Sequence, residues 1–264
     1  MKLYRYFNYD KDKKADYVYK SLETGLFKTS KVSTFNDPFD GFPIIDSDLS
    51  NESIEFFRGL IQEKTGTNVT FEEAKQSLLS TDFSKDHFDE FSDENFRVMC
   101  LCSKDKLTPA EDILMWSHYA SMHKGIRITF EIPEEPGNGR YPRLFPVIYA
   151  TSRPRLSLNK LLKKNRTPNE VDDLFNISIT KSSVWSYEHE YRLKNPPSEW
   201  QNIGGLDYLK FPESCIEEVS FGVRFPSNET SIFLNLKKDR YQHTKFYQMK
   251  YHGAEYALDK VEIK

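Results

Sequence analysis

The sequence TPAEDILMWSHYASMHKGIRITFEI, residues 108–132, predicts a helix followed directly by a strand. Thr108 is a suitable N-cap, Pro109 suits the first helical position, and Glu111 can complete a capping box. The helix is expected to continue through residues 115–120 and to end near Gly125, where a strand over residues 126–132 begins. Helix and strand are therefore neighbours in one mixed fold.

Elements of both kinds are intermixed along the rest of the chain, without a regular strand–helix–strand rhythm. This pattern favours an α+β fold with a mixed, mainly antiparallel sheet and flanking helices, in a single domain of residues 1–264. A helical insertion is expected at about residues 50–94, with a capping box at Thr70 and Glu73 and a weak helix or lid at residues 80–94. The further strands are predicted at residues 3–7, 26–30, 96–103, 145–150, 188–193, 218–223, 245–251 and 257–263, and further helices at about residues 15–24, 167–179 and 230–238.

The composition of the chain limits its class. The formal net charge of -3 argues against a protein held to nucleic acid by its whole surface, because such proteins carry a basic excess. No apolar run approaches the roughly 20 residues of a membrane span, and the mean hydropathy is -0.66. The start MKLYRYFNYD lacks the apolar stretch of a signal peptide. Three cysteines, Cys100, Cys102 and Cys215, predict reduced thiols and a cytoplasmic location.

Tyr4, Arg5 and Tyr6 lie in the first predicted strand, with the two tyrosines on one face and Arg5 on the other. An exposed arginine beside two core tyrosines is one interpretation. The alternative is an arginine at the end of the sheet whose planar guanidinium binds phosphate or ribose.

The sequence FNDPF at residues 35–39 predicts a tight turn. Asn and Asp side chains hydrogen-bond their own backbone and proline fixes φ, so a rigid surface turn explains most of this sequence. The aromatic residue on each side would hold the turn against the body of the protein. A loop held in this way can present Asn36 and Asp37 to a ligand.

His118 and His123 belong to the helical segment that begins after Thr108. His118 is four residues from Leu114 and from Met122, which places it on a semi-apolar stripe of the helix. It can therefore be interpreted either as a core histidine or as a catalytic one. His123 lies in the predicted last turn, where a cation suits the helix dipole. The two histidines do not share a helix face, and no other His or Cys spacing fits zinc, so no metal site is predicted.

Glu188, Glu190 and Arg192 are predicted to line one face of a strand that follows Lys181 and Trp185. A solvated face of Glu and Arg is common and contributes little to stability. The functional alternative is a pair of carboxylates at the mouth of a cleft, where one of them stabilises developing positive charge.

These segments together resemble a bacterial family of uncharacterised proteins. The shared pattern is an aromatic–basic–Tyr strand, an FNDPF turn, a strand that ends in Cys and Ser, an MWxHYA helix with a following HxG, and a WxYExEYR strand. The matching residues are 4–6, 35–39, 100–103, 115–125 and 185–192, which span most of the chain. This resemblance implies no activity by itself.

A more distant resemblance, to the ADP-ribosyltransferase superfamily, does imply an activity. The shared order is a strand with a basic residue, a short helix that ends in Gly-Leu, a strand that ends in Ser, and much later a strand with Glu-x-Glu. The resemblance implies a split sheet that binds NAD, with Arg5 at the ribose and phosphates and Ser30 near the second-strand position. It also implies that Glu190, preceded by Glu188, is catalytic. The Ser-Thr-Ser triplet of the second strand is absent from this chain.

The resemblance therefore implies an ADP-ribosyltransferase-like enzyme that uses NAD as its substrate and needs no metal. The acceptor would be a protein or a nucleic acid, in toxin or phage-defence biology. Glu190 would stabilise the oxocarbenium-like transition state, and an aromatic plane, Trp116 or Tyr119, would stack on nicotinamide. The other residues expected at the NAD pocket are Tyr4, Asn36, Asp37 and His118.

Two other functions fit the same residues. A metal-independent ribonuclease or related phosphodiester enzyme would use His118, Glu190 and Arg192 as acid, base and phosphate-binding group. A non-catalytic ligand- or partner-binding module would use the same polar segments as an internal scaffold. In that case substitutions at His118 and Glu190 would lower the Tm rather than abolish turnover.

Overall fold

The computed structural model describes residues 1–10, 17–81, 93, 97–132, 143–162, 176–195 and 200–263. The chain divides into two compact units. The first unit is formed by Met1–Ser30, Phe96–Val147 and Ser186–Lys264, and the second by Lys31–Asn95 and Ile148–Trp185. Two compact units can belong to one domain, so the prediction of a single domain stays a prediction.

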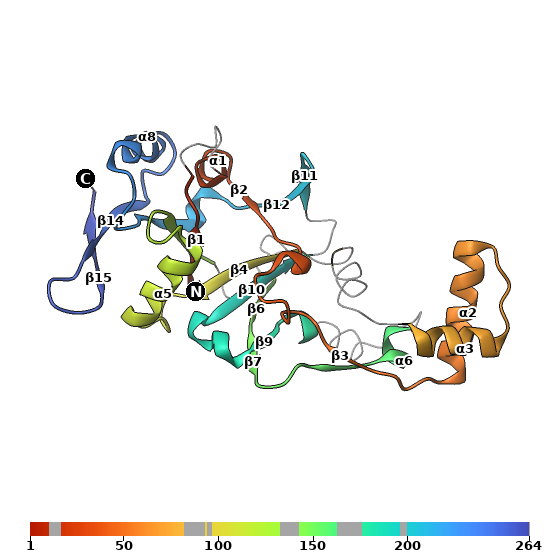
Figure 1. The fold of residues 1–264 in the computed structure, drawn as a ribbon. Helices are drawn as coiled ribbons and strands as arrows, with labels where there is room; N and C mark the ends of the chain where they lie inside the picture. The colour runs from red at the N-terminus through yellow and green to blue at the C-terminus, as the bar shows by residue number, and fades with distance from the viewer. Residues whose placement is uncertain are drawn as a thin grey trace. The chain divides into compact units, whose positions relative to one another are not determined.

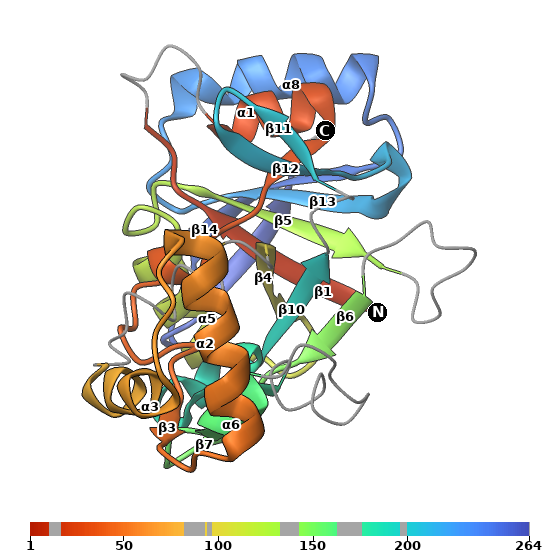
Figure 2. The same ribbon diagram turned by 90° about the vertical axis from the view of Figure 1, so that its right-hand side faces the viewer.

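An eight-stranded sheet forms the centre of the first unit, in the order β15-β14-β13-β5-β1-β4-β10-β6; Figure 1 labels β15 and Figure 2 labels β13 and β5. Neighbouring strands in this sheet are antiparallel, except for the parallel pair β13 and β14. The mixed, mainly antiparallel sheet with its helices confirms the predicted α+β class. The strands are β1 (Lys2–Phe7), β4 (Arg97–Ser103), β5 (Ile126–Glu131), β6 (Arg143–Pro146), β10 (Glu190–Asn195), β13 (Ile216–Phe221), β14 (Lys245–Tyr251) and β15 (Leu258–Glu262).

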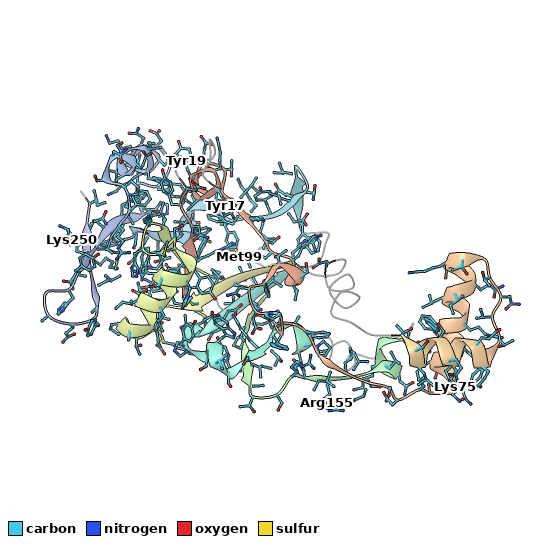
Figure 3. The ribbon with its side chains drawn as sticks, in the orientation of Figure 1. Tyr17, Tyr19, Lys75, Met99, Arg155 and Lys250 are labelled. Atoms are coloured by element: carbon cyan, nitrogen blue, oxygen red, sulfur yellow. The ribbon has the colours of Figure 1, made fainter. Side chains whose placement is uncertain are left out.

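One face of this sheet, here called the apolar face, carries the main hydrophobic core. Leu3 and Phe7 of β1 point to this face with Ile128 of β5, and all three are buried. Helices α1 (Tyr17–Thr24) and α8 (Thr230–Asp239) cover it, as Figure 2 shows. A three-stranded sheet of β11 (Gln201–Ile203), β12 (Leu206–Lys210) and β2 (Leu26–Lys28) adjoins these helices. The hydroxyl of Tyr17 in α1, labelled in Figure 3, accepts a hydrogen bond from the backbone nitrogen of Lys28 in β2.

The opposite face of the sheet, here called the polar face, is covered by α5 (Pro109–Tyr119). The helix begins as predicted, because Thr108 and Glu111 form a capping box and Pro109 occupies the first turn. Its Met115 and Trp116 pack on residues of β1 and β4. The helix ends at Tyr119, earlier than the predicted end near Gly125, and a tight loop leads into β5.

The second unit contains the helical insertion and two small parallel strand pairs. Helix α2 (Asn51–Thr65) is capped by Ser50, and α3 (Phe71–Ser80) has the predicted capping box of Thr70 and Glu73. The two helices share a small core with Leu158. The other elements are α6 (Leu158–Leu161), the pair β3 (Ile44–Asp46) and β8 (Arg155–Ser157), and the pair β7 (Ile148–Ala150) and β9 (Thr180–Ser182).

Some predicted elements differ from the structure. Residues 145–150 do not form one strand, because β6 ends at Pro146 and β7 belongs to another sheet. The strand predicted from Glu188 begins at Glu190. The weak helix or lid at residues 80–94 and most of the helix at residues 167–179 lie outside the described residues. None of the helices among the described residues combines the length and the apolar character of a membrane span.

Candidate functional site

Buried polar side chains form two rows across the polar face of the sheet. Cross-strand partners point to the same face, so the pairing register defines each row. The first row runs from β13 to β10 and consists of Glu218, Thr129, Tyr4, Cys102 and Glu190. Two residues along the strands, Ser220, Arg127 and Tyr6 form the start of a second row, and at its β10 end the half-buried Cys100 pairs with Arg192. A sheet face under a helix is usually apolar, so this concentration of polar groups marks the face as the candidate site.

Two carboxylates, Glu188 and Glu190, are buried at the β10 end of this face. Oε1 of Glu190 accepts a hydrogen bond from Nε of Arg192 at 2.8 Å, and Oε2 accepts one from Nη2 at 3.3 Å. Oε1 of Glu188 accepts a hydrogen bond from the hydroxyl of Tyr119 on α5 at 2.5 Å. Each carboxylate is therefore held in a fixed orientation by a donor from the polar face or from the helix that covers it.

A kink at His189 separates the two carboxylates. Glu188 is the last residue of the 3-10 helix η3 (Ser183–Glu188), and the prediction that it lies on a strand is wrong. His189 has a φ of 44°, in the left-handed region that favours glycine. Its backbone oxygen accepts a hydrogen bond from Ser103, and its Nε2 lies 3.4 Å from Oε2 of Glu111. Strained backbone of this kind is found at functional sites more often than elsewhere.

We expect the kink to depend on the backbone at residue 189 rather than on the imidazole. His189→Val introduces a β-branched residue that fits the left-handed region poorly, whereas His189→Asn fits it well. Both variants remove the contact with Glu111. The free energy of unfolding, measured by urea denaturation, should therefore be about 1–2 kcal/mol lower for His189→Val than for His189→Asn. Equal values for the two variants would contradict this account.

Tyr119 and His118 are adjacent on α5 but have different surroundings. Tyr119 is partly exposed and bonds Glu188. His118 is exposed, with its ring centroid 6.5 Å from that of Tyr187 and 6.1 Å from that of Tyr119. The interpretation of His118 as a core histidine is wrong, since its ring is not enclosed. His118 lies beside the side chain that holds Glu188.

Arg127 is a central residue of the polar face that the sequence reasoning missed. Its Nη1 donates to both carboxylate oxygens of Asp112 on α5, at 2.8 and 3.0 Å, and Asp112 also accepts a hydrogen bond from the hydroxyl of Tyr6. The guanidinium carbon lies 4.0 Å from the ring centroid of Tyr4 and 5.3 Å from that of Trp116. The signal available in the sequence was an arginine inside the otherwise uncharged strand sequence IRITF.

The ionisation of these groups follows their burial and their neighbours. Burial raises the pKa of the Tyr4 hydroxyl to about 12, although Arg127 opposes the change. Burial alone would lower the pKa of Arg127, but Asp112 and the tyrosines Tyr6 and Tyr4 raise it above its ordinary value. Burial also raises the pKa of the Cys102 thiol well above its usual range. Cys102 is therefore a protonated and unreactive thiol.

Arg5 and Ser30 lie away from Glu190. Arg5 alternates with Tyr4 along β1, so it points to the apolar face, where its Nη2 donates to the backbone oxygen of Lys28 at 2.9 Å. Its guanidinium carbon lies 5.0 Å from the ring centroid of Phe7. Ser30 pairs by its backbone with Val98 of β4. The structure therefore does not bring Arg5 and Glu190 together.

A second polar cluster lies in the second unit and contains the turn at residues 35–39. Oδ1 of Asp37 accepts a hydrogen bond from the backbone nitrogen of Phe39 at 2.9 Å, and Oδ2 accepts one from Nε1 of Trp185 at 2.8 Å. Nζ of Lys181 lies 3.9 Å from Oδ2 of Asp40 and 5.3 Å from the ring centroid of Trp185. The side chains of Asp37, Asp40 and Lys181 are buried, whereas Asn36 is exposed. The turn is thus fixed to β9 and to Trp185 by buried charges and an indole.

Neither cluster has the ligand set of a metal centre. Within the residues that the structure describes, no group of three or more His, Cys, Asp or Glu side chains is arranged to hold a metal ion. The carboxylates of the polar face are instead occupied by arginine, lysine and tyrosine donors, as Glu190, Glu188 and Glu218 illustrate. The arrangement suits chemistry at a fixed, buried carboxylate.

One comparison with known proteins gave a match, and it covers part of the candidate site. No curated protein matches the chain, and no solved structure matches it. A protein-family match covers residues 115–193 and is described as "Protein of unknown function (DUF2971)". The matched residues include Tyr119, Arg127, Glu188, Glu190 and Arg192. The match to this family of unknown function therefore spans the two carboxylates of the candidate site and the side chains that orient them.

Proposed function

We propose that this protein is an ADP-ribosyltransferase-like enzyme that cleaves the bond between nicotinamide and ribose in NAD. The acceptor of ADP-ribose would be a protein or a nucleic acid, and a role in toxin or phage-defence biology belongs to the same proposal. The observation that carries the proposal is the pair of buried carboxylates, Glu188 and Glu190, held by Tyr119 and Arg192 on the polar face.

The chemistry needs a carboxylate that is oriented before the reaction begins. When the bond from ribose C1′ to the nicotinamide nitrogen breaks, the electron pair leaves with nicotinamide and positive charge develops on the ribose. A preorganised carboxylate stabilises this charge more in the transition state than in the ground state. Arg192 fixes both oxygens of Glu190, which makes Glu190 our choice for this role. Glu188 is then the second carboxylate, able to accept the proton that the acceptor loses as it bonds to C1′.

The surroundings of the two aromatic candidates favour one of them for contact with nicotinamide. Trp116 is fully buried, with its ring 5.4 Å from that of Tyr6 and 6.4 Å from that of His123. Its faces are therefore occupied by the protein itself. Tyr119 is partly exposed and adjoins Glu188, so we assign stacking on the nicotinamide ring to Tyr119.

The test is release of nicotinamide from NAD by the purified chain, with water, protein extracts and RNA oligonucleotides as acceptors. Glu190→Gln keeps the shape of the side chain but removes its charge, and release is expected to fall about 100-fold or more. Glu262→Gln on the exposed edge strand β15 is the matched control and should leave release unchanged. Equal release by Glu190→Gln and wild type, or none from the folded protein with any acceptor, would exclude the proposal.

Arg5 gives a separate test of how NAD is held. The superfamily resemblance implies that Arg5 contacts the phosphates, whereas its side chain lies on the face opposite Glu190. If the reaction takes place at the polar face, Arg5→Gln should leave the KM for NAD unchanged. A large rise in KM would instead indicate that NAD enters on the apolar face.

One observation favours a non-catalytic module as the second candidate. Arg192 is 0% exposed and neutralises Glu190, which is 4% exposed, so the pair also has the features of a structural ion pair. In that case the wild-type protein would release no nicotinamide, and the effect of Glu190→Gln would be a strongly lowered Tm. Measurement of Tm and nicotinamide release on the same samples distinguishes the two functions.

A further inference from the structure

Four buried polar atoms at one corner of the polar face have no hydrogen-bond partner among the described residues. They are Nε1 of Trp116, Nδ1 of His123, Nε of Arg127 and Oγ of Ser220. The side chains of Trp116, Arg127 and Ser220 are at most 3% exposed. Buried polar atoms without a partner are rare in folded proteins and each costs about 1–3 kcal/mol, so four of them in one place need an explanation.

The four residues form one continuous group of contacts. Ser220 is the cross-strand partner of Arg127, and the guanidinium of Arg127 lies 5.3 Å from the ring centroid of Trp116. The ring of Trp116 stacks on His123 with an interplanar angle of 12°. A Cβ on Gly222, two residues after Ser220, would lie 2.2 Å from the backbone oxygen of His123. The group of contacts therefore begins at Ser220 in β13 and ends at Gly222, just after this strand.

The chemistry of these atoms selects the ligand. Nε of Arg127 and Nε1 of Trp116 can only donate, and the hydroxyl of Ser220 can also donate. Nδ1 of His123 is an acceptor, because the hydroxyl of Ser117 donates to Ile113 and so receives its hydrogen bond from Nε2 of the neutral ring. The three donors can be satisfied together only by a ligand with hydrogen-bond acceptors. Water satisfies this requirement in part, but the charges at the edge of the corner favour an acceptor that is negative.

Two cations lie at that edge. Arg224 donates its backbone nitrogen to the backbone oxygen of His123 at 3.0 Å, and Lys124 follows His123 directly. Both side chains are exposed, and neither has an ion-pair partner in the part of the chain that the structure describes. Burial and the charge of Arg224 lower the pKa of His123, so its ring is neutral near pH 7. The edge of the corner is therefore net positive, while the charge of Arg127 is balanced by Asp112.

The negative end of the α5 dipole lies close by and opposes an anion. Its effect is reduced because two carbonyl groups at the end of the helix already have donors. The oxygen of Trp116 accepts from the backbone nitrogen of His123, and that of Ala120 accepts from Gly125. The hydroxyl of Ser117 donates to the oxygen of Ile113. These bonds leave the corner with more donors than acceptors.

The loop that closes the corner has strained backbone. Ser121, Met122 and His123 have φ values of 47°, 53° and 67°, a left-handed run that non-glycine residues rarely adopt. The side chain of Asn8 holds the start of the loop, since its Oδ1 accepts from the backbone nitrogen of Ser121 at 2.8 Å. Strain of this kind persists at ligand sites where the surrounding structure fixes it.

We propose that this corner, formed by Trp116, His123, Arg127, Ser220 and Arg224, binds a small oxyanion, namely a phosphate or carboxylate group. The site is separate from the carboxylates Glu188 and Glu190, and it does not depend on the proposed NAD chemistry. Arg224 supplies the charge, and the buried donors supply the hydrogen bonds that select an oxygen-rich group.

The test is isothermal titration calorimetry with inorganic phosphate, pyrophosphate and acetate as separate ligands. Saturable binding is expected, and it should weaken as sodium chloride is raised, because the contact is between charges. Arg224→Gln and Ser220→Ala should each weaken binding about tenfold. Lys250→Gln on β14, a position labelled in Figure 3, removes an exposed cation elsewhere and should change nothing.

The outcomes separate the sources of the anion and also test the proposal itself. If phosphate or pyrophosphate binds and acetate does not, the site is a phosphate site. If only acetate binds, it is a carboxylate site. Circular dichroism and Tm confirm that each variant is folded, and Ser220→Ala without ligand should be at least as stable as wild type, since it removes an unpartnered hydroxyl. The proposal is overturned if none of the three anions binds saturably, or if Arg224→Gln and Ser220→Ala bind as tightly as Lys250→Gln.

Discussion

Arg127→Met is expected to lower the free energy of unfolding by about 3 kcal/mol or more, the effect of leaving one partner of a buried ion pair without its counter-ion. Arg127 is 3% exposed and joins Asp112 of α5 to the centre of the sheet. Without the guanidinium, the carboxylate of Asp112 keeps the hydroxyl of Tyr6 but loses its cation. Because methionine fills a similar volume, the loss of stability comes mainly from the missing charge and not from a cavity.

Equilibrium denaturation in urea measures this loss, and two further variants control for its cause. Arg58→Met breaks an exposed pair with Glu55 on α2 and should cost less than about 1 kcal/mol. The double variant Arg127→Met with Asp112→Leu removes both charges and should recover part of the stability. A loss below 1 kcal/mol for Arg127→Met alone would show that the pair is not what holds α5 to the sheet.

Gly125→Ala is expected to destabilise the first unit by at least about 3 kcal/mol, because the added methyl group has no space. A Cβ at Gly125 would lie 2.1 Å from the backbone oxygen of Phe7 and 2.8 Å from Cα of Ala120. Both are backbone atoms, so no side-chain rotation relieves the contact. The loop after α5 or the end of β1 must move, which disturbs the polar face on one side and the core on the other.

Thermal and urea denaturation measure the effect against a glycine that has space. Gly59 lies on α2 with no atom within 4 Å of the added Cβ. Gly59→Ala should therefore raise stability, by up to about 1 kcal/mol, through the better helix propensity of alanine. Similar results for the two variants would show that the close approach at Gly125 relaxes easily.

Local signals in the sequence predicted the elements that local chemistry determines. The capping boxes at Thr108 and Thr70 gave the starts of α5 and α3 correctly, because cap residues satisfy the free backbone groups of a helix wherever it packs. Alternating apolar residues gave β1 and β4 within one residue at each end. The short strands β11 and β12 were missed, since their residues are mostly exposed and show little apolar pattern.

The candidate site depends on contacts that the sequence does not specify. Alternation along β1 correctly placed Arg5 opposite Tyr4, but not which face would carry Glu190. Asp112 and Arg127 are 15 residues apart, and their pairing follows from how α5 folds back on β5. No glycine or proline in the sequence indicates the kink at His189, so residues 188–193 were predicted as one regular strand.

The position of β1 in the middle of the sheet has a consequence for synthesis of the protein. Residues 2–7 pair with residues 126–131 on one side and with residues near 102 on the other. A ribosome that adds 5–20 residues per second needs roughly 6–25 s to make the intervening chain. The nascent segment has neither neighbour until β4 is made, and it lacks one of them until β5 is made. During this time it displays an apolar side with unpaired backbone groups, so we expect a chaperone to bind it.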